Sequence, residues 1–336
     1  MLVEFLYFFN VYFLIIAIVT ILGIFLLIEL FLSIRFKRSI QSSFVETYLR
    51  FTSKRKKHAR SRRKFNKYLK RHKNRSDTFI FPKVKLCSVV NEHQIDGIQV
   101  YHLSNRQSSN CNMIIIYLHG GAYISQPLKY HWKFCDKLSI DLNADIIFPI
   151  YPLTPNHHWN ESFDLVNNLF NLVKEKTDKP IVLMGDSSGG GLALAFNEYL
   201  ALNNLKQPNC LILLSPWLDI TLSHPKISLY EKKDPMLACN PLKEIGLMWS
   251  NNLNPKDYRV SPLYGDVFNL SNVTMIVGTR EILYPEVNQF YESLKQNNVQ
   301  CDLYIGKGMN HDFPLFPIPE AKKAREYIYE TIKKYM

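Results

Sequence analysis

The sequence predicts an α/β fold with a mostly parallel sheet and helices on both faces, preceded by one membrane-spanning helix. An uncharged apolar run fills residues 5–28, and from residue 80 onward short apolar segments alternate with helical patterns. Short buried strands separated by helices are typical of parallel sheets, because each crossover places a helix against a face. The chain of 336 residues is long enough for one large core of about 250 residues.

The apolar run at residues 5–28 predicts a membrane span. Its 24 residues exceed the roughly 20 that a helix needs to cross a bilayer. The run is preceded by an acidic residue, Glu4, and ends in "ELFLSIRFKR". A cleavable signal peptide would start basic, be shorter and end in small residues. We therefore assign residues 1–34 to an N-terminal transmembrane helix of a single-pass cell-membrane protein.

A strongly basic segment follows the predicted span. Residues 35–75 carry 17 Lys and Arg against one acidic residue, Glu46. This asymmetry predicts that the C-terminal part is cytoplasmic, because positive charge collects on the inner side of a span. The commonest interpretation of such a segment is a solvated flank of the span. A second is adsorption on anionic lipid headgroups, and nucleic-acid binding comes third because an anionic membrane already lies beside the segment. We predict a juxtamembrane segment over 35–80, one that can contribute to a cap. Within it Phe65, Tyr68 and Leu69 share a helical face, which predicts an apolar face resting in the lipid interface.

The remainder of the chain is nearly neutral. Residues 76–336 carry a net charge of −2, which argues against a nucleic-acid-binding surface on the main domain. The six cysteines lie far apart and form no CxxC pair, so neither a metal site nor a disulfide framework is predicted. We expect no cofactor and no metal.

The main domain is predicted to span residues 81–336. Its strand candidates are 84–90, 97–103, 113–118, 145–150, 181–184, 211–214, 274–277 and 302–305. Its helix candidates are 161–175, 191–203, 286–296 and 320–334. The stretch 219–260 is too long for an ordinary crossover. We interpret it as a cap insertion over the carboxyl edge of the sheet, where ligands bind in such folds.

The stretch "GDSSG" at 185–189 matches the G-x-S-x-G pattern between a predicted strand and a predicted helix. That pattern holds a serine on a turn so sharp that a Cβ at either flanking position would clash with backbone. The helix that follows directs its first N–H groups toward the site, which favours negative charge there. Ser187 is therefore the predicted nucleophile.

A serine hydroxyl needs a base, and the base needs an orienting acid. His311 follows the last strand candidate in "GKGMNHDF", and Glu281 ends the preceding strand in "IVGTREIL". Both positions lie at carboxyl ends of strands, as Ser187 does. Glu286 is the alternative acid, although its place after Pro285 is typical of a first-turn helix residue. We expect Asp312, next to His311, to point elsewhere.

The oxyanion hole requires backbone N–H groups aimed at the developing negative charge. The loop "HGGAY" follows a buried strand and offers Gly120, Gly121 and Ala122. Paired glycines allow a backbone to approach a ligand closely. The further predicted donor is the N–H of Ser188, the residue after the nucleophile.

Taken together, these pieces resemble the hormone-sensitive-lipase-like (HGGG) esterase branch of the α/β hydrolases. The matching stretches, in order, are "HGGAY" at 119–123, "YPLTP" at 151–155, "GDSSGGG" at 185–191, "SPWLDIT" at 215–221, "SPLY" at 261–264, "GTREIL" at 278–283 and "GMNHDF" at 308–313. The resemblance implies an eight-stranded sheet, a helical cap and ester hydrolysis through an acyl-enzyme on Ser187. Two departures are Ala122 in place of a glycine and Glu281 in place of an aspartate.

Three functions are compatible with the sequence. The first is a membrane-anchored serine hydrolase that cleaves short or medium acyl esters, including amphiphilic small-molecule substrates. The second is an amidase or deacetylase that uses the same triad on N-acyl groups. The third is a non-catalytic ligand-binding protein on this fold, which would be expected to lack the serine or the histidine. Both residues are present.

Overall fold

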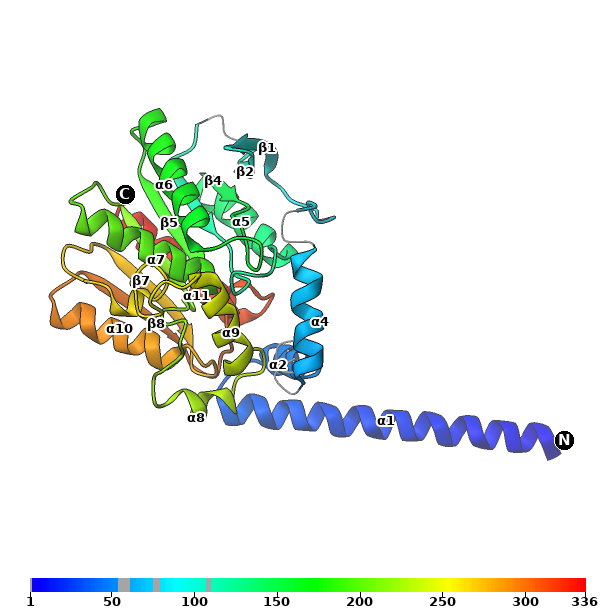
Figure 1. The fold of residues 1–336 in the computed structure, drawn as a ribbon. Coiled ribbons are helices and arrows are strands. Elements are labelled where there is room, and N and C mark those ends of the chain that lie inside the picture. The colour runs from blue at the N-terminus through cyan, green and yellow to red at the C-terminus, as the bar shows by residue number, and fades with distance from the viewer. Residues whose placement is uncertain (1, 54–60, 75–78, 107–109) are drawn as a thin grey trace.

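The computed structural model describes residues 2–53, 61–74, 79–106 and 110–336, with side chains from residue 12 onward. A rounded α/β body carries one long N-terminal helix that projects away from it (Figure 1). Parts of the predicted basic segment, at 54–60 and 75–78, lie outside the described residues.

Within the described residues, three helices precede the sheet: α1 (Leu2–Phe36), α2 (Ile40–Thr52) and α4 (Arg62–Lys73). Among the described residues, α1 is the single helix long and apolar enough to cross a membrane, over Tyr12–Phe36. Only 6% of its most apolar stretch is buried, so α1 is not a core helix of the body. A signal sequence near the N-terminus would be equally long and apolar. The α2 helix folds back along α1, where Phe44 meets Phe25 and the Thr47 hydroxyl donates to Glu29 at 2.6 Å.

The sheet has eight strands in the order β1-β2-β4-β3-β5-β6-β7-β8. They are β1 (Val89–Ile95), β2 (Ile98–Ser104), β3 (Met113–Leu118), β4 (Ala144–Pro149), β5 (Ile181–Asp186), β6 (Cys210–Leu214), β7 (Val273–Gly278) and β8 (Cys301–Gly306). The pairs β1–β2 and β2–β4 are antiparallel, and every other pair is parallel. The predicted mostly parallel eight-stranded sheet is confirmed.

The first strand lies later in the chain than predicted. We expected residues 84–90, but β1 begins at Val89 and pairs Ile95 with Ile98. Asp96 and Gly97 form the two-residue turn with φ of 52° and 78°, the geometry that suits a tight hairpin. This turn fixes the register of β1 on β2. The chain before β1 instead contacts the helix that contains Asp136. The N–H groups of Cys87 and Ser88 both donate to the Asp136 carboxylate.

Helices cover both faces of the sheet. One face packs against α5 (Lys129–Leu142) and α11 (Pro319–Lys334), and the other against α6 (Trp159–Lys176), α7 (Ser187–Leu202) and α10 (Tyr284–Gln296). Side chains alternate between the two cores, as the period of a strand requires: Tyr117 faces the α5 side and Leu118 the α7 side. Because β3 to β8 are parallel, their carboxyl ends meet at one edge of the sheet.

The stretch 219–260 carries α8 (Ile227–Glu231) and α9 (Cys239–Ser250) at that edge. Short 3₁₀ turns follow at η1 (Pro262–Tyr264) and η2 (Phe313–Leu315). The α4 helix packs on this region through Phe65, which is 3% exposed and contacts Ile124 and Ile245. The predicted lipid-facing role of Phe65, Tyr68 and Leu69 is therefore wrong: this apolar face covers the body, since burial there removes it from water.

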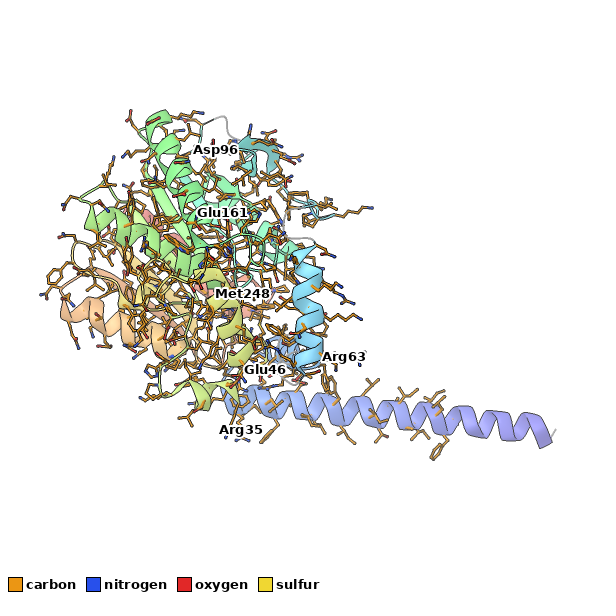
Figure 2. The ribbon with its side chains drawn as sticks, in the orientation of Figure 1. Arg35, Glu46, Arg63, Asp96, Glu161 and Met248 are labelled. Carbon is orange, nitrogen blue, oxygen red and sulfur yellow. The ribbon has the colours of Figure 1, made fainter. Side chains whose placement is uncertain are left out.

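Consequently the outer side of α4 is basic. Its exposed residues include every Lys and Arg of the helix, namely Arg62, Arg63, Lys64, Lys67, Lys70, Arg71 and Lys73. Arg63 lies on the side of α4 that faces away from the body (Figure 2). In Figure 1, α4 runs across the direction in which α1 projects. Arg62 pairs with Glu244 of α9, and we call the other six side chains the α4 basic face.

Candidate active site

Ser187 lies on the sharp turn between β5 and α7. Its φ is 51°, in the left-handed region, and the residue is only 4% exposed. A Cβ on Gly185 would lie 2.4 Å from the Gly189 carbonyl oxygen, and one on Gly189 would lie 2.1 Å from that of Leu118. Both distances are sterically impossible, so the flanking glycines are what allow the serine to occupy this strained position.

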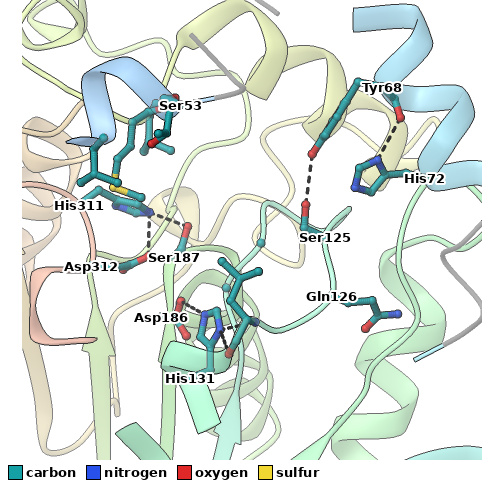
Figure 3. A pocket seen from close by; sticks show the side chains of 17 residues that line it. Ser53, Tyr68, His72, Ser125, Gln126, His131, Asp186, Ser187, His311 and Asp312 are labelled. Carbon is teal, nitrogen blue, oxygen red and sulfur yellow. Dashed lines mark hydrogen bonds and ion pairs between the residues drawn. The ribbon is translucent and has the colours of Figure 1, made fainter. Parts of the chain in front are cut away.

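The structure brings Ser187, His311 and Glu281 together (Figure 3 shows the first two). The Nε2 atom of His311 lies 2.9 Å from Oγ of Ser187, and Nδ1 lies 2.6 Å from Oε2 of Glu281. Each residue follows a different strand: β5, β8 and β7 respectively. Because these strands are parallel and close in the sheet, residues over 100 positions apart in the chain converge at its carboxyl edge.

Glu281 is held from both sides. Its Oε1 accepts hydrogen bonds from the Ser215 hydroxyl at 2.8 Å and the Gly278 N–H at 2.7 Å, which leaves Oε2 for the histidine. Ser215 follows β6, the strand between β5 and β7. The alternative acid, Glu286, is buried in the first turn of α10, and among the described residues neither of its carboxylate oxygens has a hydrogen-bond partner. Burial raises the pKa of Glu286 well above its ordinary value.

Asp312 does not point away, and the expectation that it would is wrong. Its φ of 52° turns the side chain back so that Oδ2 lies 3.0 Å from Nε2 of His311 (Figure 3). Burial raises the pKa of Asp312 to about 7. Burial disfavours the imidazolium, but the negative charges of Asp312 and Glu281 outweigh this and raise the pKa of His311 well above its ordinary value. Ser187 and Asp312 thus share the same histidine nitrogen.

The predicted oxyanion loop lies beside the nucleophile. A Cβ on Gly120 would lie 2.9 Å from Cβ of Ser187, so the loop backbone closely approaches the serine. Ala122 and Tyr123 both have φ of 57°, and the Tyr123 N–H donates to Oγ of Ser188 at 3.2 Å. A Cβ on Gly120 would also lie 2.0 Å from Oδ2 of Asp186, so the loop backbone closely approaches this carboxylate as well. The assignment of Gly120, Gly121, Ala122 and Ser188 as oxyanion donors stays a prediction.

A second buried pair, Asp186 and His131, lies beneath the sharp turn that carries Ser187 and was not predicted. The carboxylate of Asp186 accepts from the Tyr117 hydroxyl at 2.6 Å and lies 3.2 Å from Nε2 of His131. Nδ1 of His131 accepts the Leu128 N–H at 2.9 Å, which places the ring proton on Nε2, toward Asp186. Asp186 is the variable residue of the G-x-S-x-G pattern, so the pattern carries no signal for this contact.

The triad opens into a cavity of about 530 Å³. Its lining includes Gly121, Ser187 and His311 from the sheet edge, together with Met236 and Leu237 from the 219–260 stretch. The N-terminal helices complete the wall, with Leu49, Thr52 and Ser53 from α2 and Tyr68 and His72 from α4 (Figure 3). These cap residues were not among the predicted site residues, because nothing in a basic juxtamembrane segment specifies which side chains turn inward.

Comparison with known proteins identifies the family of this chain. A sequence profile of the family described as the alpha/beta hydrolase fold matches residues 115–315. An esterase from Acinetobacter venetianus is 32% identical over 230 residues, covering 67% of this chain and 76% of its own. A solved candidate esterase from Staphylococcus aureus superposes with a TM-score of 0.77 at 31% identity, covering 81% of this chain and 93% of that one.

A further solved structure, an esterase from the bacterial hormone-sensitive lipase family, has a TM-score of 0.74 over 89% of this chain and 99% of its own. At 22% identity it shows the shared fold alone. The profile covers more than half of the chain, and the Acinetobacter relative exceeds 30% identity. The chain therefore belongs to the α/β-hydrolase family and is a carboxylesterase-like hydrolase.

Proposed function

We propose that this protein is a membrane-anchored serine esterase that hydrolyses short or medium acyl esters through an acyl-enzyme on Ser187. The observation that carries the proposal is the chain of contacts from Ser187 Oγ to His311 Nε2 at 2.9 Å and from Nδ1 to Glu281 at 2.6 Å. This order supplies a nucleophile, a base and an orienting acid.

In the first half-reaction Oγ of Ser187 attacks the ester carbonyl carbon, while its proton passes to Nε2 of His311. Glu281 stabilises the resulting imidazolium through Nδ1. The tetrahedral intermediate collapses as Nε2 gives the proton to the leaving alkoxide, so the alcohol departs and the acyl group remains on Oγ. Water, deprotonated by the same nitrogen, then attacks the acyl-enzyme and releases the carboxylic acid.

The oxyanion of each tetrahedral intermediate requires fixed donors. We assign this role to the N–H groups of Gly120, Gly121, Ala122 and Ser188. Ser188 lies in the first turn of α7, so its N–H acts together with the helix dipole.

Membrane anchoring rests on α1. From Phe5 to Ile28 α1 carries no charge and, where its side chains are described, it is mostly exposed. Glu29 is 1% exposed and hydrogen-bonds to Thr47 of α2, so α2 covers this carboxylate, while Leu30, Phe31 and Ile34 beyond it are exposed again. We propose that the span continues past Glu29 to about residue 34 and that the hydrolase domain is cytoplasmic, because the Lys and Arg residues follow the span. An amphiphilic ester dissolved in the membrane would then lie close to the site.

An ester and amide panel tests the chemistry. With the full chain in detergent micelles, we expect p-nitrophenyl esters of short and medium acids to be cleaved much faster than matched anilides. Ser187→Ala should abolish ester cleavage while leaving the unfolding temperature nearly unchanged, since a small hydroxyl is removed. Faster cleavage of anilides would favour an amidase, and full ester activity in Ser187→Ala would place the nucleophile elsewhere.

A further inference from the structure

A buried charge cluster around Glu46 of α2 joins the N-terminal helices to the body. Glu46 is 3% exposed. Its Oε1 accepts from Arg50 and, at 2.7 Å, from Nη2 of Arg280. Its Oε2 accepts from Arg38 and, at 2.9 Å, from Nε of Arg280. Arg280 therefore binds both carboxylate oxygens, the geometry in which an arginine fixes its partner best.

This cluster reaches the two loops that carry the acid and the base of the proposed triad. Arg280 directly precedes Glu281, and its N–H donates to the Met309 carbonyl oxygen at 2.9 Å. Arg38 donates from Nη1 to the Gly308 carbonyl oxygen at 3.0 Å, three residues before His311. One carboxylate on α2 thus holds, through two arginines, the loop after β7 and the loop after β8.

The arrangement is fixed by packing as well as by charge. The Arg280 guanidinium lies 3.9 Å from the ring centroid of Phe36, at the end of α1. Burial raises the pKa of Glu46, but the hydrogen bonds and charges of Arg280 and Arg38 outweigh it and lower the pKa to about 2. The carboxylate therefore stays ionised throughout the pH range in which a histidine base works.

We propose that Glu46 is a positioning residue for the hydrolase site: it holds the Glu281 loop and the His311 loop in the relative position that lets the acid orient the base. The inference rests on the proposed function, because it concerns the same triad. It assigns a role in turnover to the segment between the membrane anchor and the domain. A displacement of about 1 Å between catalytic groups can cost roughly 100-fold in rate.

The test compares Glu46→Gln with Glu320→Gln in the full chain in detergent micelles. Glu320 of α11 is a matched control, because its carboxylate also ties the start of α2 to the body, through Ser39 and Ser42. None of these three contacts involves the loops that carry Glu281 and His311. We expect Glu46→Gln to lower kcat and the rate of fluorophosphonate labelling by about 10- to 100-fold with little change in KM. Glu320→Gln should lower the unfolding temperature but leave kcat within about 2-fold.

Three outcomes are decisive. Equal kcat in Glu46→Gln and the wild type would overturn the positioning role, and so would a loss of kcat in Glu320→Gln as large as in Glu46→Gln. If Glu46→Gln does not fold, Arg280→Lys replaces it: the charge is kept but the two-point contact is lost, and the same fall in kcat is expected. A wild-type protein that is not labelled at Ser187 would refute the proposed function itself.

Discussion

At the residue scale, the length of the Glu281 side chain is matched by its surroundings. Ser215 and the Gly278 backbone fix one carboxylate oxygen, so the other lies 2.6 Å from the histidine. Glu281→Gln should reduce kcat by about 10³-fold or more, because a neutral amide no longer stabilises the imidazolium and can favour the wrong tautomer. Steady-state kinetics on a p-nitrophenyl ester measures this change.

Glu286→Gln provides the matched control for that substitution. Burial raises the pKa of Glu286, which favours its neutral form, and an amide of similar shape replaces a neutral carboxyl closely. We expect kcat within about 2-fold of the wild type, as for a change with no contact to the reacting atoms. A large loss in Glu286→Gln with a small one in Glu281→Gln would transfer the acid's role to Glu286.

Asp312 predicts a specific pH dependence. His311 acts as a base only when Nε2 is unprotonated, and the neighbouring carboxylates of Asp312 and Glu281 raise its pKa. Raising the pKa keeps the base protonated up to a higher pH, so the acid limb of the kcat/KM profile lies high. Asp312→Asn removes one negative charge. The acid limb should move to lower pH, with activity at pH 6 rising relative to activity at pH 8; an unmoved limb would show that Asp312 does not act on His311.

The sequence could predict Ser187, His311 and Glu281 because chain order and strand ends determine where such residues meet. It could not predict Asp312 at the histidine, since that contact depends on a single left-handed φ after the last strand. The Asp186–His131 pair was equally hidden. His131 has no fixed spacing from the G-x-S-x-G pattern. Only the packing of α5 beneath the turn between β5 and α7 brings the two side chains together.

At the element scale, α4 binds the body with one face and offers the α4 basic face to the outside. A protein lacking residues 1–34 should be soluble yet still bind anionic vesicles through this face. Changing Arg63, Lys67 and Lys70 to alanine should weaken that binding by about 3 kcal/mol at low salt, roughly 100-fold. Vesicle co-sedimentation with phosphatidylserine measures it, and the binding should fall steeply with salt as the Debye length shortens.

A matched control removes the same charge elsewhere. Lys322, Lys323 and Lys333 are exposed on a different helix, α11. Their replacement by alanine should leave vesicle binding nearly unchanged. Equal losses in both triple variants would mean that net charge, rather than the α4 basic face, drives the adsorption.

The elements also show where sequence patterns are ambiguous. The period of Phe65, Tyr68 and Leu69 identifies an amphipathic helix but not what its apolar face meets, and the body provides Ile124 and Ile245 as partners. The same limit applies to the first strand. Alternation suggested 84–90, whereas the Asp96–Gly97 turn fixes the pairing at Val89–Ile95. The central strands were predictable because they are buried on both faces and read as continuous apolar runs.

At the scale of the whole molecule, the proposed topology places the hydrolase domain on the cytoplasmic side. Protease added outside right-side-out vesicles should therefore leave the domain intact, and digestion should occur only after the membrane is permeabilised. The physical reason is the cost of moving the many Lys and Arg residues after the span across the bilayer. Cleavage from outside would instead indicate an exported esterase whose basic flank violates the usual charge distribution.

The central claim is that the sheet edge assembles one activated serine, and covalent labelling tests it most directly. The full chain in detergent micelles is treated with a fluorophosphonate, digested and analysed by mass spectrometry. We predict a single phosphonyl adduct on the peptide that contains Ser187, which disappears in Ser187→Ala and slows sharply in His311→Ala. An adduct on any other residue, or labelling that persists in Ser187→Ala, would contradict the account.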